Sequence, residues 1–267
     1  DPVPLASASI GQVHAARLAD GREVVVKVQR PGVEAQVEVD LQILGRVADW
    51  AAANTEFGRD YEVRPLVDEF ANTIRNELDY VHEGETADRF RRAFAGDRRV
   101  SIPLVHWDLT TRRVLTLERV TGVKISDLDA LDRLGTRRRG IAENWVRIFL
   151  RGVFELGFFH ADPHPGNFFA RSDGGLAIVD FGMVGRVPAA LRMRLLRAGL
   201  SALREDSEGL AEELYAMGVA GPRADRPGFM RDLDHVIGRY GGRALPELSA
   251  AEVTRVLTGV VYPHRLP

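Results

Sequence analysis

The stretch "HADPHPGN", residues 160–167, limits the local structure of this chain more than any other segment. Pro163 and Pro165 each fix one backbone angle and lack an N–H, so a regular helix cannot pass through them. A short hairpin around "SDGG" follows, and then an apolar strand, "LAIV", which leads into "DFG". Asp162 and Asp180 therefore flank a hairpin, a layout that can bring both carboxylates to one metal ion.

The two histidines of this stretch offer a competing interpretation as a metal site. His160 and His164 are four residues apart, a spacing that suits Zn²⁺ when both side chains lie on one helix. The prolines exclude that helix, and the chain contains neither cysteine nor an "HExxH" pattern. We therefore favour a polar loop in which Asp162 and Asn167 carry the chemistry, with a zinc site and a purely structural turn as the alternatives.

Hydrophobic periodicity predicts strands first and helices later in the chain. "SIGQVHAARL" and "REVVVKVQ" read as strands joined at "ADG", since Asp-Gly between two such runs is a strong hairpin signal. Helical spacing predicts one helix over 33–53, a second from Pro65 past Phe90, and another over 140–157. Residues 100–122 read as a strand pair joined by "DLTTRR".

Together these elements predict an α+β fold in two lobes. The first is a β-rich N-lobe with inserted helices, residues 1–121, and the second is a mostly helical C-lobe, residues 122–267. The hydrophobic share of 45% and the charged share of 28% are ordinary for a soluble globular protein.

Composition excludes several classes of function. The formal net charge of −2 provides no basic surface for nucleic acid. Without cysteine there is no disulfide framework and no thiolate metal site. No apolar run is long enough to span a membrane and no signal peptide is recognisable, which predicts a cytoplasmic location.

Four polar residues suit phosphoryl transfer from a nucleotide: Lys27, Asp162, Asn167 and Asp180. Such a site needs a cation at the phosphates, oxygen ligands for Mg²⁺ and a base beside the attacking group. Lys27 follows a β-branched run in "VVVKV", close to the kinase pattern "VAIK", and Asp162 and Asn167 keep the spacing of the kinase catalytic loop. Lys27 is one of two lysines among 36 basic residues, which suggests a tight polar site that arginine does not fit.

Five longer stretches resemble the UbiB/AarF atypical kinases, also called the ADCK family. They are "PLASASIGQVHAARL", "VVVKVQRPG", "ELDYVHEGETADRF", "FHADPHPGNFF" and "VDFGMVGR". The resemblance implies a protein-kinase-like fold in which an alanine-rich loop replaces the usual glycine-rich one. Here that nucleotide loop is Ala6, Ser7, Ala8 and Ser9, whose Cβ atoms should limit how closely the backbone approaches phosphates.

The resemblance also assigns roles to single residues. Lys27 is expected to contact the α- and β-phosphates of ATP or ADP and to pair with a carboxylate on a helix. Spacing alone leaves four candidates for that carboxylate, namely Glu77, Asp79, Glu83 and Glu85. The family pattern selects Glu83 and makes Glu77 and Asp79 the regulatory E-x-D motif. It further implies that Asp162 is catalytic, that Asn167 and Asp180 bind Mg²⁺, and that the adenine meets the backbone between Glu118 and Val120.

The family implies a Mg²⁺-dependent ATPase or small-molecule kinase that supports prenylquinone or related isoprenoid-lipid metabolism. The expected partners are prenylquinone precursors, isoprenoid lipids and quinone-biosynthesis enzymes, with peripheral association at the cytoplasmic face of a membrane. The family's upstream K-x-G-Q motif does not occur in this sequence, so we expect a kinase core without that regulatory cover.

Two other functions compete with this one. A nucleotide-gated module that binds lipids or partner proteins with little catalysis is the main alternative, because the alanine-rich loop can hinder catalytic closure. A conventional protein kinase is disfavoured, since helical spacing resumes soon after "DFGMVG" and no "APE" follows.

Overall fold

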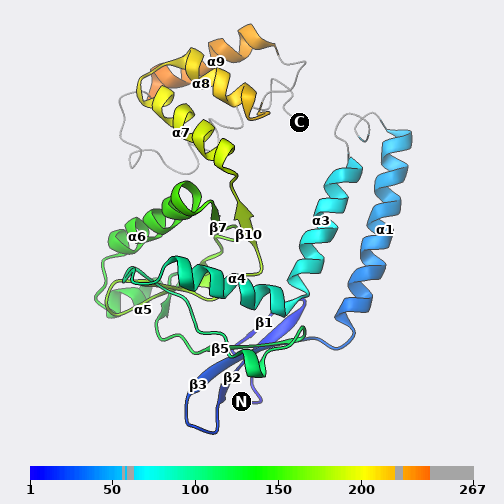
Figure 1. Ribbon diagram of the computed structural model, residues 1–267, viewed down its shortest axis with the longest axis vertical. Coiled ribbons are helices and arrows are strands. Elements are labelled where there is room, and N and C mark those ends of the chain that lie inside the picture. The colour runs from blue at the N-terminus through cyan, green and yellow to red at the C-terminus, as the bar shows by residue number, and fades with distance from the viewer. Residues whose placement is uncertain (56–57, 59–62, 220–224, 241–267) are drawn as a thin grey trace. The chain divides into compact units, whose positions relative to one another are not determined.

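The computed structural model describes residues 1–55, 58, 63–219 and 225–240, and the chain divides into two compact units. The first unit is Asp1–Arg186 and carries strands β1 to β10; the second is Val187–Pro267 (Figure 1). The predicted lobe boundary after residue 121 falls inside the first unit and stays a prediction.

The first sheet places Lys27 at its centre. Its strands are β1 (Ala6–Ser7), β2 (Gly11–Arg17), β3 (Glu23–Gln29) and β5 (Val114–Glu118), antiparallel and in the order β1-β2-β3-β5. The β2–β3 hairpin is the one predicted from "ADG", and Gly21 takes the left-handed conformation (φ 89°) that its turn requires. Lys27 lies opposite Val13 on one neighbour and Leu115 on the other.

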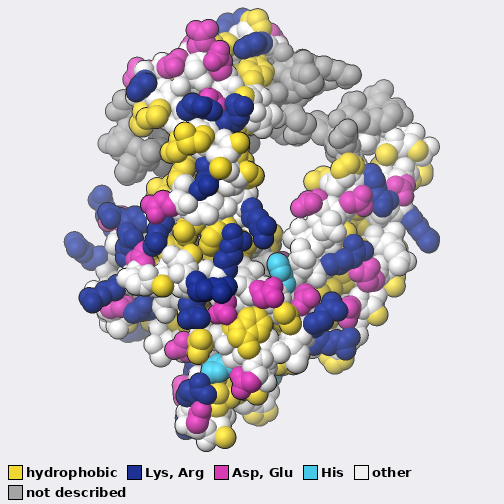
Figure 2. Space-filling view, in the orientation of Figure 1, with side chains coloured by type: hydrophobic (Ala, Val, Ile, Leu, Met, Phe, Trp, Pro, Cys, Tyr) yellow, Lys and Arg dark blue, Asp and Glu magenta, His cyan; other side chains and the backbone are white. Residues whose placement is uncertain are grey.

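Helices α1 (Val33–Asn54) and α3 (Val63–Glu77) lie side by side after the hairpin (Figure 1). Helix α1 matches the predicted helix over 33–53. Ion pairs tie the two helices together: Arg64 Nη1 lies 2.8 Å from Asp49 Oδ1, and Arg75 Nε lies 2.7 Å from Glu38 Oε1. Figure 2 shows the result, with basic and acidic side chains mixed over this helix pair.

The single helix predicted from Pro65 past Phe90 is wrong, because the chain breaks it at Leu78 and Asp79. Helix α3 ends at Glu77, and a separate helix, α4 (Tyr80–Ala93), follows. Asp79 takes extended backbone angles and its Oδ1 accepts the N–H of Val81 at 3.0 Å. Aspartate competes with the helix by bonding its own neighbouring backbone, so it starts a new helix rather than continuing the old one.

This cap leads to a testable prediction. Replacing Asp79 by Ala should lower the free energy of unfolding by about 1 kcal/mol, measured by urea denaturation, because the Val81 N–H loses its acceptor. Asp79→Asn is the matched control, since it keeps the acceptor oxygen and loses only the charge that faces Arg112 at 3.3 Å. An equal loss in both variants would assign the effect to that ion pair instead.

Residues 94–186 complete the first unit with short elements. They are β4 (Val100–Ser101), η1 (Trp107–Leu109), β6 (Val123–Lys124), α5 (Leu128–Arg133), α6 (Arg138–Leu150), the π-helical turn η2 (Arg151–Leu156), β7 (Phe158–His160), η3 (Pro165–Asn167), β8 (Phe168–Ala170), β9 (Leu176–Ile178) and β10 (Val184–Arg186). The strands form a sheet of order β4-β9-β8-β6 and the pair β10-β7. Antiparallel β8 and β9 are the hairpin predicted around "SDGG".

The strand pair predicted over residues 100–122 is confirmed only in part, because its first strand divides between two sheets. Strand β4 pairs in parallel with β9, and two isolated antiparallel bridges, Val105 to Leu117 and Thr111 to Val114, join the rest of the segment to β5. Pro103 lacks an N–H and so interrupts any continuous ladder through this segment.

One hydrophobic core runs through the first unit and anchors the segments that carry the polar residues. It joins α4, β5, α6 and the short strands, with Phe90, Phe158, Phe168 and Phe181 among its fully or nearly fully buried side chains. Phe181, the middle residue of "DFG", is 1% exposed and its ring lies 5.2 Å from that of Phe90. Burying such a ring is worth about 1.5–3 kcal/mol, which fixes the adjacent Asp180 in place.

In the second unit, the described residues form α7 (Ala189–Leu203), α8 (Ser207–Ala216) and α9 (Arg226–Tyr240). Ala211, Phe229 and Leu233 form its small core. Arg194 and Arg197 both pair with Glu213, which links α7 to α8.

Candidate active site

Lys27, Glu83 and Asp180 meet at one point, although they lie far apart in the sequence. The ammonium of Lys27 donates to both oxygens of Glu83, at 3.0 and 2.8 Å, and lies 3.4 Å from Asp180 Oδ2. Glu83 is 3% exposed and Lys27 19% exposed, whereas Asp180 is 37% exposed. Glu83 is therefore an internal partner, and Asp180 still faces an open space.

Lys27 and Asp180 each stabilise the charged form of the other, whereas burial and the charge of Asp180 raise the pKa of Glu83. Burial alone lowers the pKa of Lys27, but the negative charges of Glu83 and Asp180 outweigh it and raise that pKa above its ordinary value. Burial likewise works to raise the pKa of Asp180, and Lys27 reverses the effect and lowers it. Lys27 is thus held as a cation and Asp180 as an anion at neutral pH.

The loop after β7 presents Asp162 and Asn167 together. Asn167 Nδ2 donates to Asp162 Oδ2 at 2.7 Å, and the backbone N–H of His164 donates to the other oxygen, Oδ1, at 3.1 Å. Both oxygens of the carboxylate are therefore oriented by the loop itself. The prolines at 163 and 165 leave the loop no helical path, as predicted, apart from the single 3-10 turn η3.

The two histidines of the loop bind backbone groups. His160 Nε2 contacts the carbonyl oxygen of Asp180, and its Nδ1 accepts the N–H of Asp162 at 3.2 Å. His164 Nδ1 accepts the N–H of Gly166 at 3.1 Å. Within the described ranges, no three His, Cys, Asp or Glu side chains gather in a metal-binding cluster.

The oxygen donors of the site suit Mg²⁺ better than Zn²⁺. Magnesium in nucleotide sites takes one or two carboxylates and completes its shell with phosphate oxygens and water. Asp180 supplies a partly exposed carboxylate and Asn167 an amide oxygen, so the residues present fit this ion.

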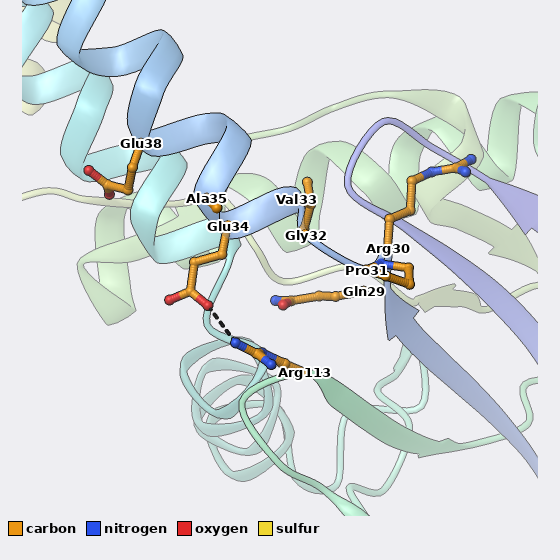
Figure 3. Close-up of a pocket in the computed structure, with 9 residues that line it drawn as sticks. All are labelled: Gln29, Arg30, Pro31, Gly32, Val33, Glu34, Ala35, Glu38 and Arg113. Carbon is orange, nitrogen blue, oxygen red and sulfur yellow. Dashed lines mark hydrogen bonds and ion pairs between the residues drawn. The ribbon is translucent and has the colours of Figure 1, made fainter.

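Of the segment predicted as the nucleotide loop, Ala6 and Ser7 form strand β1, and Ala8 and Ser9 lie in the tight turn to β2, which Arg30 holds. The N–H of Ala8 donates to Gly11 O at 2.9 Å and closes the turn. Arg30 Nε donates to Ala8 O at 3.0 Å and its Nη2 to Ser7 Oγ at 2.7 Å. A cavity of about 410 Å³ opens beside Arg30 at the start of α1, bridged by the ion pair of Glu34 with Arg113 at 2.9 Å (Figure 3). This cavity lies at the outer end of β3 rather than at Lys27.

The remaining predicted site residues have separate positions. Glu77 ends α3, and its pKa is raised by burial and by the charges of Asp180 and Asp162, with which it shares one region. Asp79 caps α4. Glu118 ends β5 and its Oε2 accepts the N–H of Leu104 at 3.2 Å, so the segment to Val120 continues from the edge of the first sheet.

Comparison with known proteins identifies the family. The model of the ABC1 atypical kinase-like domain matches residues 1–214. The chain belongs to this family. "Protein ACTIVITY OF BC1 COMPLEX KINASE 7, chloroplastic" of Arabidopsis thaliana is 41% identical over 222 residues, covering 83% of this chain and 32% of that protein. "Probable protein kinase UbiB" of Cellvibrio japonicus is 40% identical over 213 residues, 78% of this chain and 39% of that protein. The chain therefore spans less than half of either relative.

A solved structure confirms the fold class. "The complex structure of Rv3197-erythromycin from Mycobacterium tuberculosis" has a TM-score of 0.67 at 28% identity, covering 98% of this chain and 60% of that one. The predicted α+β, protein-kinase-like fold and the predicted family are both confirmed. As for membranes, the part of the chain that the structure describes holds no helix both long and apolar enough to cross one.

Three residues of this ABC1-family site escaped sequence reasoning: Arg30, Tyr80 and Gly11. The ring of Tyr80 lies 5.0 Å below the ammonium of Lys27, and burial raises the pKa of its hydroxyl to about 12. A Cβ on Gly11 would lie 2.5 Å from that hydroxyl, so glycine is required there. The turn signal in "RPG" did not indicate that Arg30 contacts the nucleotide loop, because that contact depends on how β1 pairs.

Proposed function

We propose that this chain is the nucleotide-binding core of a Mg²⁺-dependent atypical kinase or ATPase. The observation that carries the proposal is the meeting of Lys27, Glu83 and Asp180 beside the Asp162–Asn167 pair. Each polar group that phosphoryl transfer requires is present. Membership of an atypical kinase-like family supports nucleotide binding.

In this proposal Lys27 binds the α- and β-phosphates, and Glu83 keeps its ammonium extended toward them. Asn167 and Asp180 hold Mg²⁺, which when bound neutralises charge on the phosphate oxygens. Asp162 orients the attacking hydroxyl or water and accepts its proton, while the turn over Ala6, Ser7, Ala8 and Ser9 covers the phosphates. The adenine lies against the backbone from Glu118 to Val120.

The test is nucleotide turnover by the chain. We expect phosphate release from ATP that requires Mg²⁺, and a rise in melting temperature when ADP and Mg²⁺ are added together. Asn167→Ala should reduce turnover about 10- to 100-fold while the variant still binds nucleotide. The proposal would be refuted if the wild-type chain showed no turnover and no Mg²⁺-dependent thermal shift.

A nucleotide-gated binding module is the second candidate. Arg30 holds the nucleotide turn by two hydrogen bonds, and the Cβ atoms of the alanine and serine residues there limit how closely the turn can approach phosphates. The two functions differ in turnover relative to affinity, measured with and without polar-headed isoprenoid lipids. Turnover that isoprenoids stimulate severalfold favours the enzyme; tight nucleotide binding with negligible turnover favours the module.

The wider biological role is also a proposal. Support of prenylquinone or isoprenoid-lipid metabolism at the cytoplasmic face of a membrane is proposed from the family resemblance. The chain spans less than half of the length of the Arabidopsis thaliana and Cellvibrio japonicus relatives, so the substrates and partners of the whole protein are proposals too.

A further inference from the structure

The loop from Asp162 to Asn167 is closed by hydrogen bonds that meet at His164. The backbone N–H of His164 donates to Asp162 Oδ1 at 3.1 Å, and its backbone carbonyl accepts the N–H of Asn167 at 3.0 Å. The ring Nδ1 accepts the N–H of Gly166 at 3.1 Å. The backbone of His164 therefore contacts both Asp162 and Asn167, and its side chain contacts Gly166, which lies between them in the loop.

The imidazole of His164 supplies a hydrogen-bond acceptor that the backbone of the loop does not supply to the Gly166 N–H. Gly166 lies in the first turn of η3, where an N–H has no partner within the helix. His164 is the N-cap of this turn, and its side chain supplies the missing acceptor. The next peptide unit carries the N–H of Asn167, which donates to the His164 carbonyl, so His164 restrains the two successive peptide units that lead to Asn167.

Gly166 is matched to this ring. A Cβ at Gly166 would lie 2.9 Å from Nδ1 and 3.1 Å from Cε1 of His164, too close for the present hydrogen bond. Gly166 does not have a positive φ, so conformational freedom is not the reason for glycine here. The absence of a side chain instead lets the imidazole sit directly over the loop.

We propose that His164 is a positioning residue that fixes Asn167 against Asp162 by capping the Gly166 N–H. The contact it maintains is the 2.7 Å hydrogen bond between Asn167 Nδ2 and Asp162 Oδ2. This inference rests on the proposed function, since it assigns to a third residue the geometry of the catalytic pair. Displacing a reacting group by about 1 Å can cost about 100-fold in rate, so a cap of this kind has a large effect on turnover.

Two substitutions separate capping from other roles of the ring. His164→Ala removes the acceptor. His164→Asn keeps one, because the Oδ1 of asparagine bonds the N–H two residues ahead in an Asx turn. Gly166→Ala displaces the ring without altering it and should resemble His164→Ala. His82→Ala, at an exposed position in α4, controls for the general loss of a histidine.

The experiment measures Mg²⁺-ATP turnover, nucleotide affinity and melting temperature, together with hydrogen exchange of the Gly166 N–H and the Asn167 side-chain amide by NMR. We expect His164→Ala to lower turnover about 10- to 100-fold with little change in affinity, and His164→Asn to restore most of it. Exchange at both amides should accelerate in His164→Ala and Gly166→Ala but not in His164→Asn or His82→Ala.

The exchange readout does not depend on catalysis. A wild-type chain with neither turnover nor a Mg²⁺-dependent thermal shift would refute the proposed function, while protection of the two amides would still decide whether His164 holds the pair. Unchanged exchange in His164→Ala, or no rescue by His164→Asn, would overturn the positioning role.

Discussion

Asp180→Asn should abolish Mg²⁺-dependent ATP turnover, lowering it by about 100-fold or more, because the charged metal ligand becomes neutral. The fold should persist. Phe181 stays buried in the core, and the amide oxygen can still accept the Gly182 N–H that Asp180 Oδ1 accepts at 3.0 Å. The lost contact with Lys27 at 3.4 Å involves a side chain that is 37% exposed, so its effect on stability should stay below about 1 kcal/mol.

Asp173→Asn is the matched control for this experiment. Asp173 lies in the turn of the β8–β9 hairpin, which precedes Asp180 in the chain, and its Oδ1 accepts the N–H of Gly175 at 3.0 Å. Phosphate release and melting temperature should both remain close to wild type in this variant. Equal turnover in wild type and Asp180→Asn would remove Asp180 from the metal site and with it the assignment of the whole cluster.

Lys27→Met should destabilise the chain by about 3–5 kcal/mol near neutral pH, because it leaves Glu83 buried without its cation. Glu83 is 3% exposed, and the Lys27 ammonium donates to both of its carboxylate oxygens. Replacing both residues, as in Lys27→Met with Glu83→Met, should recover most of the loss, since two apolar side chains of similar size leave no buried charge. Lys124→Met, at the only other lysine and on an exposed residue of β6, should change stability by less than about 0.5 kcal/mol.

The stability of Lys27→Met should also depend on pH in a definite direction. In Lys27→Met, loss of the cation raises the folded-state pKa of Glu83 further above its unfolded value, so folding takes up a proton and stability rises more steeply as pH falls from 8 to 5. In the wild type, burial already raises the pKa of Glu83, although Lys27 opposes the rise. The contributions of Lys27, with a raised pKa, and of Asp180, with a lowered one, are fully present over the same range. Urea denaturation at several pH values tests this, and equal pH slopes in the two proteins would contradict it.

The predictions that held concern residues whose behaviour depends on their immediate neighbours. Gly21 allowed the β2–β3 turn, Pro163 and Pro165 excluded a helix from the loop, and the helix of α1 followed from its own apolar spacing. The failures arose where a local signal met a competing one. Helical spacing continued through Asp79, but its side chain capped the next helix, and strand-like residues around Pro103 found partners in two different sheets.

The sequence by itself determined the family, the α+β class and which residue types could carry phosphoryl transfer, because motif order and short-range periodicity are properties of neighbouring residues. Only the tertiary structure decided which groups meet. On spacing alone four carboxylates were equal candidates for Lys27, and the break at Asp79 is what starts α4 so that Glu83 reaches the ammonium. Arg30 on the nucleotide turn and the ring of His164 on Gly166 were likewise decided by folding, since each depends on how distant or tightly turned backbone is brought within hydrogen-bonding distance.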